Sequence, residues 1–472
     1  MSNRNFELMK STIILSIGQV VPKLLAIFVL PILTAFLTKR DYGLYELTLS
    51  VASFCIPLLS VQIQQGVFRF LLDSKNKKER IIASSFWFIV LSFIFFSIPL
   101  VIAWSMYTND VLLGILFFIS YFSEVLLSWS SQTVRGFGDN MSYSVAYIIY
   151  SIIYIVLLFM FILLTKSLTV QEVAIAMVIA YFLSFVFLVI RKKLFLYIAI
   201  KNCQKSILIM LLKYSAPMVI SSVALWIVNL SDRFFVSGFL GIEMAAVYSV
   251  ANRIPNLFNS VYNIFNLAWT ENTSRLSEEE KREGYYTQFF KEFYQVMVGM
   301  ILVLMTLTPI MFTVLINRKY AEAYSLMSWL YVGVFFSSLV SFFGSIYIGE
   351  KRTMDVGVSS AIGALINVVI NLLFMKSFGV VIAAFSTIVS FLVICIYRAI
   401  DIKKYVRISY DLGSIIIGSF FVCGIAVVNN TKSVVSFIIS LIIAIGYNIV
   451  FNKSIVMRIE SIIKNKIRRI EE

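Results

Sequence analysis

Long apolar stretches alternate with short polar ones along the chain from residue 11 to residue 452. Each apolar stretch has about the 20 residues that an α-helix needs to cross a bilayer. We therefore expect an all-α polytopic membrane protein with fourteen transmembrane helices. The predicted spans cover residues 11–36, 44–65, 81–104, 111–130, 143–164, 171–190, 214–236, 242–267, 288–316, 324–348, 355–375, 379–397, 411–428 and 433–452.

The eighth predicted span carries a row of amides. Five asparagines recur within Tyr248–Glu271 at spacings of 4, 3, 4 and 3, which places them on one face of a helix: Asn252, Asn256, Asn259, Asn263 and Asn266. A polar stripe on an otherwise apolar helix is typical of a water-filled cavity between transmembrane helices. The alternative is that each amide bonds a neighbouring helix. Because five amides in one row exceed what such bonding requires, we favour the cavity.

Composition agrees with a membrane protein and narrows its chemistry. The 472 residues are 60% hydrophobic and 14% charged, with a mean hydropathy of +0.90, which is far from the usage of soluble domains. Histidine is absent, and the four cysteines lack the paired spacing of a zinc or redox site. Since the longest predicted loop has roughly 25 residues, a soluble catalytic domain has no room. We expect no catalytic residues, no metal and no cofactor, and hence no enzyme.

Lysine and arginine set the predicted orientation. Of the 40 basic residues, 30 fall on the side that holds both termini and every second loop, and 7 fall in the opposite loops. Because basic loops stay in the cytoplasm, we expect both termini to be cytoplasmic. The net charge of +15 then reflects topology and attraction to anionic lipid headgroups, and it requires no nucleic-acid partner.

The chain contains an internal repeat at an offset of 203 residues, at which Phe36-Leu37 recurs as Phe239-Leu240. Six predicted spans precede the basic linker Arg191–Lys213 and six follow it, so the two repeats are parallel six-helix lobes. We place the lobes at residues 1–200 and 201–400, followed by two further helices and a basic tail in residues 401–472. The offset also gives the second span a polar face that matches the eighth: Glu46, Ser50, Ser53, Pro57, Ser60 and Gln64.

Several short elements in order carry a family resemblance. They are LTKRDYGLY after span one, QQGVFRFLL after span two, TVRGFGDNMSY after span four, SDRFFVSGFLG through YSVANR across spans seven and eight, and GEKRTM before span eleven. Together they resemble the polysaccharide-transporter branch of the MOP superfamily, the Wzx-type flippases for lipid-linked oligosaccharides of O-antigen, capsule and teichoic acid. The resemblance implies two lobes in a V around a central lumen, as in MATE transporters, and alternating access.

The resemblance also implies a substrate and a location. The substrate is an oligosaccharide repeat unit on undecaprenyl pyrophosphate, flipped from the cytoplasmic to the outer leaflet of a bacterial plasma membrane. The partners would be this lipid-linked glycan, the bilayer and glycan polymerase or assembly proteins, and we expect a monomer.

A diphosphate needs cations, so basic residues within or near spans are candidate ligands: Lys23, Arg69, Arg135, Arg233 and Arg253. Lys23 lies mid-span, where snorkelling to an interface is difficult. Arg253 stands beside the asparagine row, and its alternative role is a salt bridge to Asp232 or Glu46. For Arg233, a structural pair with the adjacent Asp232 explains the sequence as well as ligand contact does.

Polar residues complete the predicted lumen. The stripe comprises Gln19, Ser53, Ser60, Asn252, Asn256, Asn259, Asn263, Asn367 and Asn371. Ion coupling or charge balance falls to three embedded acids: Glu46, Glu124 and Asp232. Tyrosines at positions 143, 147, 150 and 154 form a row that serves either packing or sugar stacking.

Three other functions stay open. A MATE-type multidrug exporter shares the fold, but Lys23 would repel its cationic substrates. A membrane glycan polymerase or transferase would need a large external loop or a DxD acid pair, and neither occurs in the sequence. A lipid II flippase is closest to the favoured function, because its substrate has the same diphosphate lipid.

Overall fold

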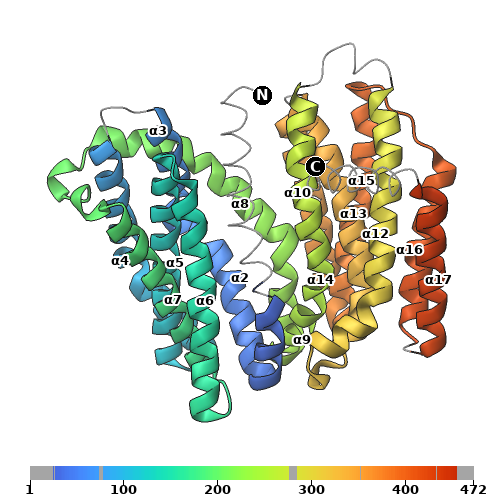
Figure 1. Cartoon of the computed structure of the whole chain (residues 1–472), viewed down its shortest axis with the longest axis horizontal. Helices are drawn as coiled ribbons and strands as arrows, with labels where there is room; N and C mark the ends of the chain where they lie inside the picture. The colour runs from blue at the N-terminus through green and yellow to red at the C-terminus, as the bar shows by residue number, and fades with distance from the viewer. Residues whose placement is uncertain are drawn as a thin grey trace, which may run out of the picture. The chain divides into compact units, whose positions relative to one another are not determined.

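The computed structural model describes residues 25, 27–73, 78–275, 284–350, 352–431 and 433–453. The long elements of this part of the chain are all α-helices (Figure 1). The chain divides into two compact units, Met1–Arg233 and Phe234–Glu472. The boundary falls inside one long helix, α8 (Lys205–Leu240).

In the first unit, α5 is the central helix. It packs against α3, α4 and α7, and α6 packs against α7 (Figure 1). A short apolar helix, Ile27–Phe36, precedes these elements. The helices are α2 (Lys39–Ser60), α3 (Ile63–Asp73), α4 (Lys78–Thr108), α5 (Val111–Gly136), α6 (Asn140–Thr165) and α7 (Val170–Arg191), followed by the 3-10 turns η1 (Leu194–Leu196) and η2 (Ile200–Asn202) and by most of α8.

In the second unit, α13 is the central helix. It packs against α9, α10, α15 and α16, while α14 packs mainly against α15. The elements are α9 (Ile242–Arg253), α10 (Pro255–Arg275), α12 (Tyr285–Leu315), η3 (Arg318–Tyr320), α13 (Ala323–Gly349), α14 (Thr353–Phe378), α15 (Val381–Asp401), η4 (Ile402–Lys404), α16 (Leu412–Asn429) and α17 (Val434–Phe451).

Side-chain caps mark where the helices of the first unit begin. Thr38, Asp110 and Asp139 each accept a hydrogen bond from a backbone N–H in the following turn. Before α7, Thr169 and Glu172 form a reciprocal capping box. The polar residues between the apolar stretches are therefore helix-start signals, which keep the loops short and the helix positions fixed.

Eleven helices in the described part of the chain are long and apolar enough to cross a membrane. They coincide with predicted spans two to six and nine to fourteen, and the protein is a multi-pass membrane protein. Predicted span seven is helical within α8. Most of span one, and the tail helix predicted after residue 453, lie outside the described residues.

Two predicted spans are not continuous helices. The expectation of one helix over residues 44–65 is wrong, because α2 ends at Ser60 and α3 begins only at Ile63. The expectation over residues 242–267 is wrong at one point, since α9 ends at Arg253 and α10 begins at Pro255. Proline has no N–H and interrupts helical bonding. The asparagine row is consequently divided between two helices.

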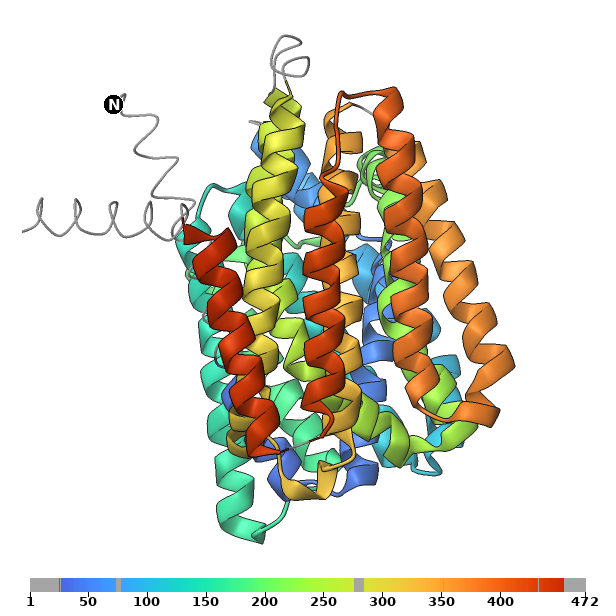
Figure 2. The same cartoon turned by 90° about the vertical axis from the view of Figure 1, so that its right-hand side faces the viewer.

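Amide side chains bond the last two helices to α12, beside which they lie in Figure 2. Asn448 on α17 donates to the carbonyl of Gly299 at 3.3 Å. Asn429 on α16 donates to the carbonyl of Met305 at 2.8 Å. Bonds of this kind are the usual means of specific helix association in lipid, where apolar surfaces have little preference for one another. The final pair of helices is thus fixed to the second unit in one register.

At Gly299, even a small side chain would disturb the packing of α17 against α12. A Cβ added there would lie 2.4 Å from side-chain atoms of Asn448 and Asn452. We expect Gly299→Ala to lower the melting temperature of the detergent-solubilised protein, with an overpacking cost of about 1–3 kcal/mol. Gly424→Ala is the matched control, because a Cβ at Gly424 meets nothing within 4 Å. An equal fall in melting temperature in both variants would contradict this packing of α17 on α12.

Candidate functional site

An arginine held by aromatic rings lies at the C-terminal end of α5. The guanidinium carbon of Arg135 is 4.5 Å from the ring centre of Phe68 on α3 and 5.2 Å from that of Tyr143 on α6. Its Nη1 donates to Oε1 of Gln132 at 3.0 Å, whereas its buried Nε has no hydrogen-bond partner among the described residues. No carboxylate of the described chain pairs with it. Among the described side chains, the rings therefore hold a cation that no carboxylate neutralises, which suits an anionic ligand.

Arg233, in contrast, is neutralised. Its Nη1 lies 3.1 Å from Oε2 of Glu46, and the two side chains are 13% and 1% exposed. The same nitrogen donates to Oγ of Ser50 at 3.0 Å, and Trp226 donates to the Ser50 carbonyl at 2.7 Å. This buried ion pair joins α2 to α8. The partner of Arg233 is thus Glu46, whereas the sequence suggested the adjacent Asp232.

Glu124 lies in a tyrosine cluster inside the first unit. Tyr181 on α7 interacts with its carboxylate, and the ring of Tyr181 stacks on that of Tyr150 with centres 4.3 Å apart. Tyr150 also stacks on Tyr154 at 6.0 Å. Because these ring faces contact one another, Tyr150 and Tyr154 make packing contacts in this structure, which is one of the two roles predicted for the row. The spacing of the tyrosine row gives no sign of Tyr181, because Tyr181 belongs to a different predicted span.

The asparagines of α9 and α10 occupy different environments. Asn266 accepts a hydrogen bond from Ser345 on α13 at 2.9 Å and so connects two helices. Asn259 donates to Asn256 at 3.1 Å, and Asn256 and Asn263 are exposed in the structure. The row therefore combines interhelical bonding at Asn266, in the C-terminal half of α10, with exposed amides at the N-terminal side of it.

Asn367 and Asn371 are buried between α14 and α15. Asn367 donates to Ser386 on α15 at 3.2 Å, Asn371 donates to Asn367 at 3.1 Å, and Ser386 donates to Asn371 at 3.2 Å. Each group satisfies the next in a closed ring of hydrogen bonds. These contacts are those of interhelical bonding, which was the alternative considered for the asparagines of the eighth span.

The remaining sequence candidates are dispersed. Lys23 and Gln19 lie outside the described residues. Arg69 is exposed on α3, Arg253 is half-buried at the end of α9, and Asp232 is buried on α8. Three side chains donate hydrogen bonds to carbonyls of their own helices: Ser53, Ser60 and Asn252.

Arg398 is not among the candidates predicted from the sequence, because it directly follows predicted span twelve and is indistinguishable there from the basic residues of the next loop. This arginine is only 2% exposed on α15. Within the described chain it has no acidic partner, since Asp401 bonds Tyr347 and Lys404 instead. It donates to four neutral acceptors at 2.8 to 3.0 Å, namely the carbonyls of Val340 and Val356 and the hydroxyls of Ser359 and Ser360. These contacts join α13, α14 and α15, which indicates a structural role.

The loop between α5 and α6 is fixed by Asp139. Its carboxylate lies 2.5 Å from Nζ of Lys192 at the end of α7 and accepts hydrogen bonds from the backbone and hydroxyl of Ser142. Partial burial raises the pKa of Asp139, but the bonds from Lys192 and Ser142 outweigh it and lower the pKa to about 2. The TVRGFGDNMSY motif thus ties three helices together beside Arg135.

Asp139→Asn removes the negative charge of this contact and keeps the helix cap, because asparagine also caps helices. The change in stability should therefore come from the lost charge alone. The folded pKa lies below the unfolded value, so the carboxylate stabilises the protein above pH 3.8 and loses this effect as the pH falls toward 2. We expect the variant to melt a few degrees below wild type at pH 7, a loss of about 1 kcal/mol for a partly screened pair. Melting curves in detergent should show the difference shrinking between pH 4 and pH 2. A difference that does not depend on pH would contradict the assignment.

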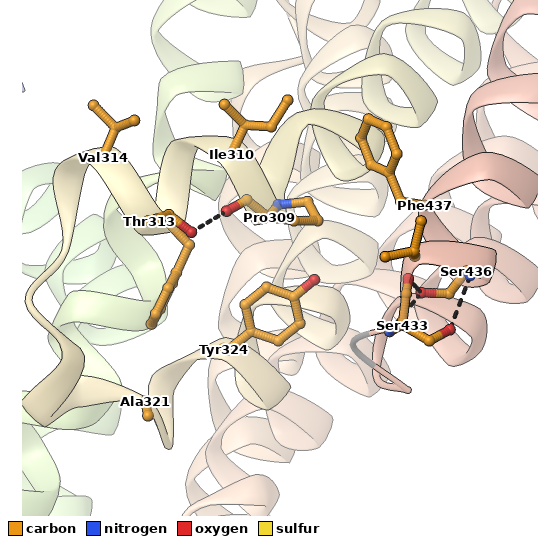
Figure 3. A pocket seen from close by; sticks show the side chains of 11 residues that line it. Pro309, Ile310, Thr313, Val314, Ala321, Tyr324, Ser433, Ser436 and Phe437 are labelled. Carbon is orange, nitrogen blue, oxygen red and sulfur yellow. Dashed lines mark hydrogen bonds between the residues drawn. The ribbon is translucent and has the colours of Figure 1, made fainter.

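Two cavities of the second unit contain none of the predicted site residues. The larger, of about 680 Å³, lies where α12, α13 and α17 meet, and Figure 3 shows Pro309, Tyr324 and Phe437 around it. The smaller, of about 530 Å³, lies beside Lys291 and Asp411, whose charged groups are 3.2 Å apart. The candidate site of the described chain is therefore the arginine–aromatic cluster of the first unit.

Comparison with solved structures identifies the fold. An inward-facing multidrug resistance MATE family transporter of the MOP superfamily matches with a TM-score of 0.66 at 16% identity, over 84% of this chain and 98% of that one. The lipid II flippase MurJ, in an inward closed conformation, matches with a TM-score of 0.66 at 14% identity, over 95% and 99%. A MOP superfamily transporter from Pyrococcus furiosus matches with 0.57 at 16% identity, over 84% and 95%. The chain has the fold of MOP-superfamily transporters.

The family follows from the sequence itself. Residues 8–270 match the family described as polysaccharide biosynthesis protein, and this match covers more than half of the chain. The protein belongs to that family, which confirms the resemblance carried by its motifs. A search of curated proteins gives no match.

Proposed function

We propose that the protein is a flippase that moves an undecaprenyl-pyrophosphate-linked oligosaccharide repeat unit from the cytoplasmic to the outer leaflet of a bacterial plasma membrane. Its family and its MOP fold support transport in polysaccharide synthesis. The observation that carries the proposal is Arg135, a cation without an acidic partner in the described chain, at the end of α5 predicted to be cytoplasmic. That is the side on which the lipid-linked substrate is made.

The chemistry of Arg135 fits a diphosphate headgroup. Guanidinium presents planar N–H donors that match phosphate oxygens in pairs. At 4 Å, a pair of unit charges is worth about 4 kcal/mol at an effective dielectric of about 20. Phe68 and Tyr143 limit hydration of the cation without neutralising it. Alternating access then transfers the headgroup and glycan while the polyprenyl tail remains in lipid, with a monomer as the transporting unit.

Arg135 also bears on the two alternative functions. A multidrug exporter must attract cations, and Arg135 repels them. A lipid II flippase has specific support, because the match to the lipid II flippase MurJ covers 95% of this chain. Arg135 would serve either diphosphate lipid, so the glycan distinguishes the two functions.

A reconstituted flipping assay tests the proposal. The purified protein is placed in vesicles with a fluorescent undecaprenyl-diphosphate oligosaccharide, and a membrane-impermeant quencher reports which leaflet holds the label. We expect protein-dependent flipping of this lipid and no uptake of a cationic dye in the same vesicles. Flipping of lipid II in preference to the oligosaccharide lipid would favour the alternative, and dye transport without lipid flipping would refute the proposal.

A further inference from the structure

The break between α2 and α3 is strained. Val61 has φ 47° and ψ 29°, and Gln62 follows with φ 52°, so two consecutive non-glycine residues adopt the left-handed conformation. A β-branched residue is rarely found there, because its Cβ crowds the following carbonyl. Neither glycine nor proline occupies the break. Strain of this kind persists only where neighbouring structure enforces it, and it gathers at switch regions.

Contacts from α4 and α8 enforce the break. Ser92 on α4 donates to the carbonyl of Leu59 at 2.7 Å, which takes up a carbonyl freed at the end of α2. Gln62 donates to Oγ of Ser222 on α8 at 3.0 Å. Buried Gln64 donates to Gln62 at 3.3 Å, but its own oxygen has no partner in the described chain. The present conformation therefore leaves one buried acceptor unsatisfied.

Past the break, α3 lies directly on α8. A Cβ at Gly66 would be 2.8 Å from Oγ of Ser215, so the two backbones approach closely. The rings of Phe70 and Tyr214 meet edge to face with centres 5.6 Å apart. Helix α3 thus meets α8 at Gly66 and Phe70, while its main packing is against α5 and α4. A shift of α8 would release α3 at these two contacts.

The same helix covers Arg135. Phe68 of α3 supplies the ring 4.5 Å from the guanidinium, and Leu71 of α3 would lie 2.7 Å from a Cβ at Gly136. If Val61 and Gln62 became right-handed, α2 and α3 would form one helix of about 50 Å at 1.5 Å per residue. Such a helix exceeds the roughly 30 Å hydrocarbon thickness. Because straightening would change the direction of α3, Phe68 would leave the guanidinium.

We propose that α3 is a hinged cover, which turns at Val61–Gln62 to bury or uncover Arg135 during transport. In the present conformation α8 holds the cover closed. Release of α3 from α8 lets the break straighten, removes the left-handed strain and uncovers the cation for an anionic headgroup. The proposal rests on the proposed function only in assigning the headgroup to Arg135.

A disulfide lock tests the hinge. A Cβ at Gly66 would lie 2.8 Å from Oγ of Ser215, so Gly66→Cys with Ser215→Cys brings two thiols within reach of a disulfide. Both are introduced into a full-length chain whose native cysteines are replaced by alanine: Cys55, Cys203, Cys395 and Cys423. We expect oxidation to stop glycan export and reduction to restore it. Each single cysteine variant should export equally under both conditions. Normal export by fully oxidised protein would overturn the proposal.

A labelling experiment tests the hinge independently of transport. Arg135→Cys is added to the lock, and modification at position 135 by an aqueous maleimide is read by peptide mass spectrometry. We expect labelling in the reduced protein and protection in the oxidised one, and equal labelling would overturn the hinge. If Arg135→Ala exports glycan normally, Arg135 is not the headgroup ligand, while this labelling still decides whether α3 moves. If the wild-type protein flips no lipid-linked glycan, the proposed function fails and the labelling result still stands.

The strained residue provides a second test. Val61→Gly removes the steric cost of the left-handed conformation, so it should favour the covered state, raise the yield of the 66–215 disulfide and slow export. Val61→Ile keeps the branched side chain and is the matched control. Faster export by Val61→Gly than by Val61→Ile would show that the break does not limit uncovering and would contradict the hinge.

Discussion

Replacing Arg135 by alanine should abolish glycan export while leaving the amount of folded protein in the membrane near that of wild type. Within the described part of the chain, the side chain makes one hydrogen bond, to Gln132, and contacts two ring faces, so folding loses only about 1–2 kcal/mol. Substrate capture loses the attraction of one cation for a diphosphate, about 4 kcal/mol per unit pair at an effective dielectric of about 20. That is roughly a thousandfold in affinity.

Two further variants separate charge from packing at this position. Arg135→Lys should retain part of the export, because an ammonium binds phosphate as a point charge but cannot form paired bonds. Gln132→Ala removes the hydrogen-bond partner and keeps the cation, so its export should stay close to wild type. Export by a deletion strain carrying each variant, measured beside membrane abundance, provides the comparison. Near-normal export by Arg135→Ala would exclude this residue as the headgroup ligand.

The positions of the helices could be predicted from the sequence because each depends on local information. Apolar length sets a span, and caps such as Asp110 and Thr169 set where it begins. The sequence analysis missed the break at Pro255, although proline interrupts helical bonding and is a local signal for it. The break at Val61–Gln62 has no such local signal, because contacts from distant helices hold a pair of residues that locally prefer another conformation.

The candidate site was less predictable, because charge depends on pairing in three dimensions. Sequence alone ranked Arg233 and Arg135 together as candidate ligands. The fold brings Glu46 to Arg233, whereas the described residues around Arg135 are rings and an amide. No spacing along the chain encodes that difference. The asparagines pose the same problem, since an amide that lines a cavity and one that bonds a helix have the same helical periodicity. Asn367, closed into a hydrogen-bond ring with α15, is of the second kind.

Arg398 should be the most sensitive single position for folding in the second unit. Hydrogen bonds to a charged group contribute about 1.5–3 kcal/mol each, and this guanidinium donates four. Together they outweigh the several kcal/mol that burying one unpaired cation costs. Arg398→Met keeps the length of the side chain and removes the donors. We expect a net loss of about 3 kcal/mol, seen as low membrane abundance and a melting temperature far below wild type.

The geometry of the guanidinium, more than its charge, should account for this loss. Arg398→Lys keeps the charge, but one ammonium cannot reach acceptors on α13 and α14 together, so the variant should be nearly as unstable as Arg398→Met. Gly344→Ala approaches the same group from α13, since its Cβ would lie 2.9 Å from Nη1 of Arg398. It should destabilise moderately, whereas Gly357→Ala on α14, where a Cβ meets nothing within 4 Å, should not. A lysine variant as stable as wild type would show that the charge suffices and that the four bonds add nothing.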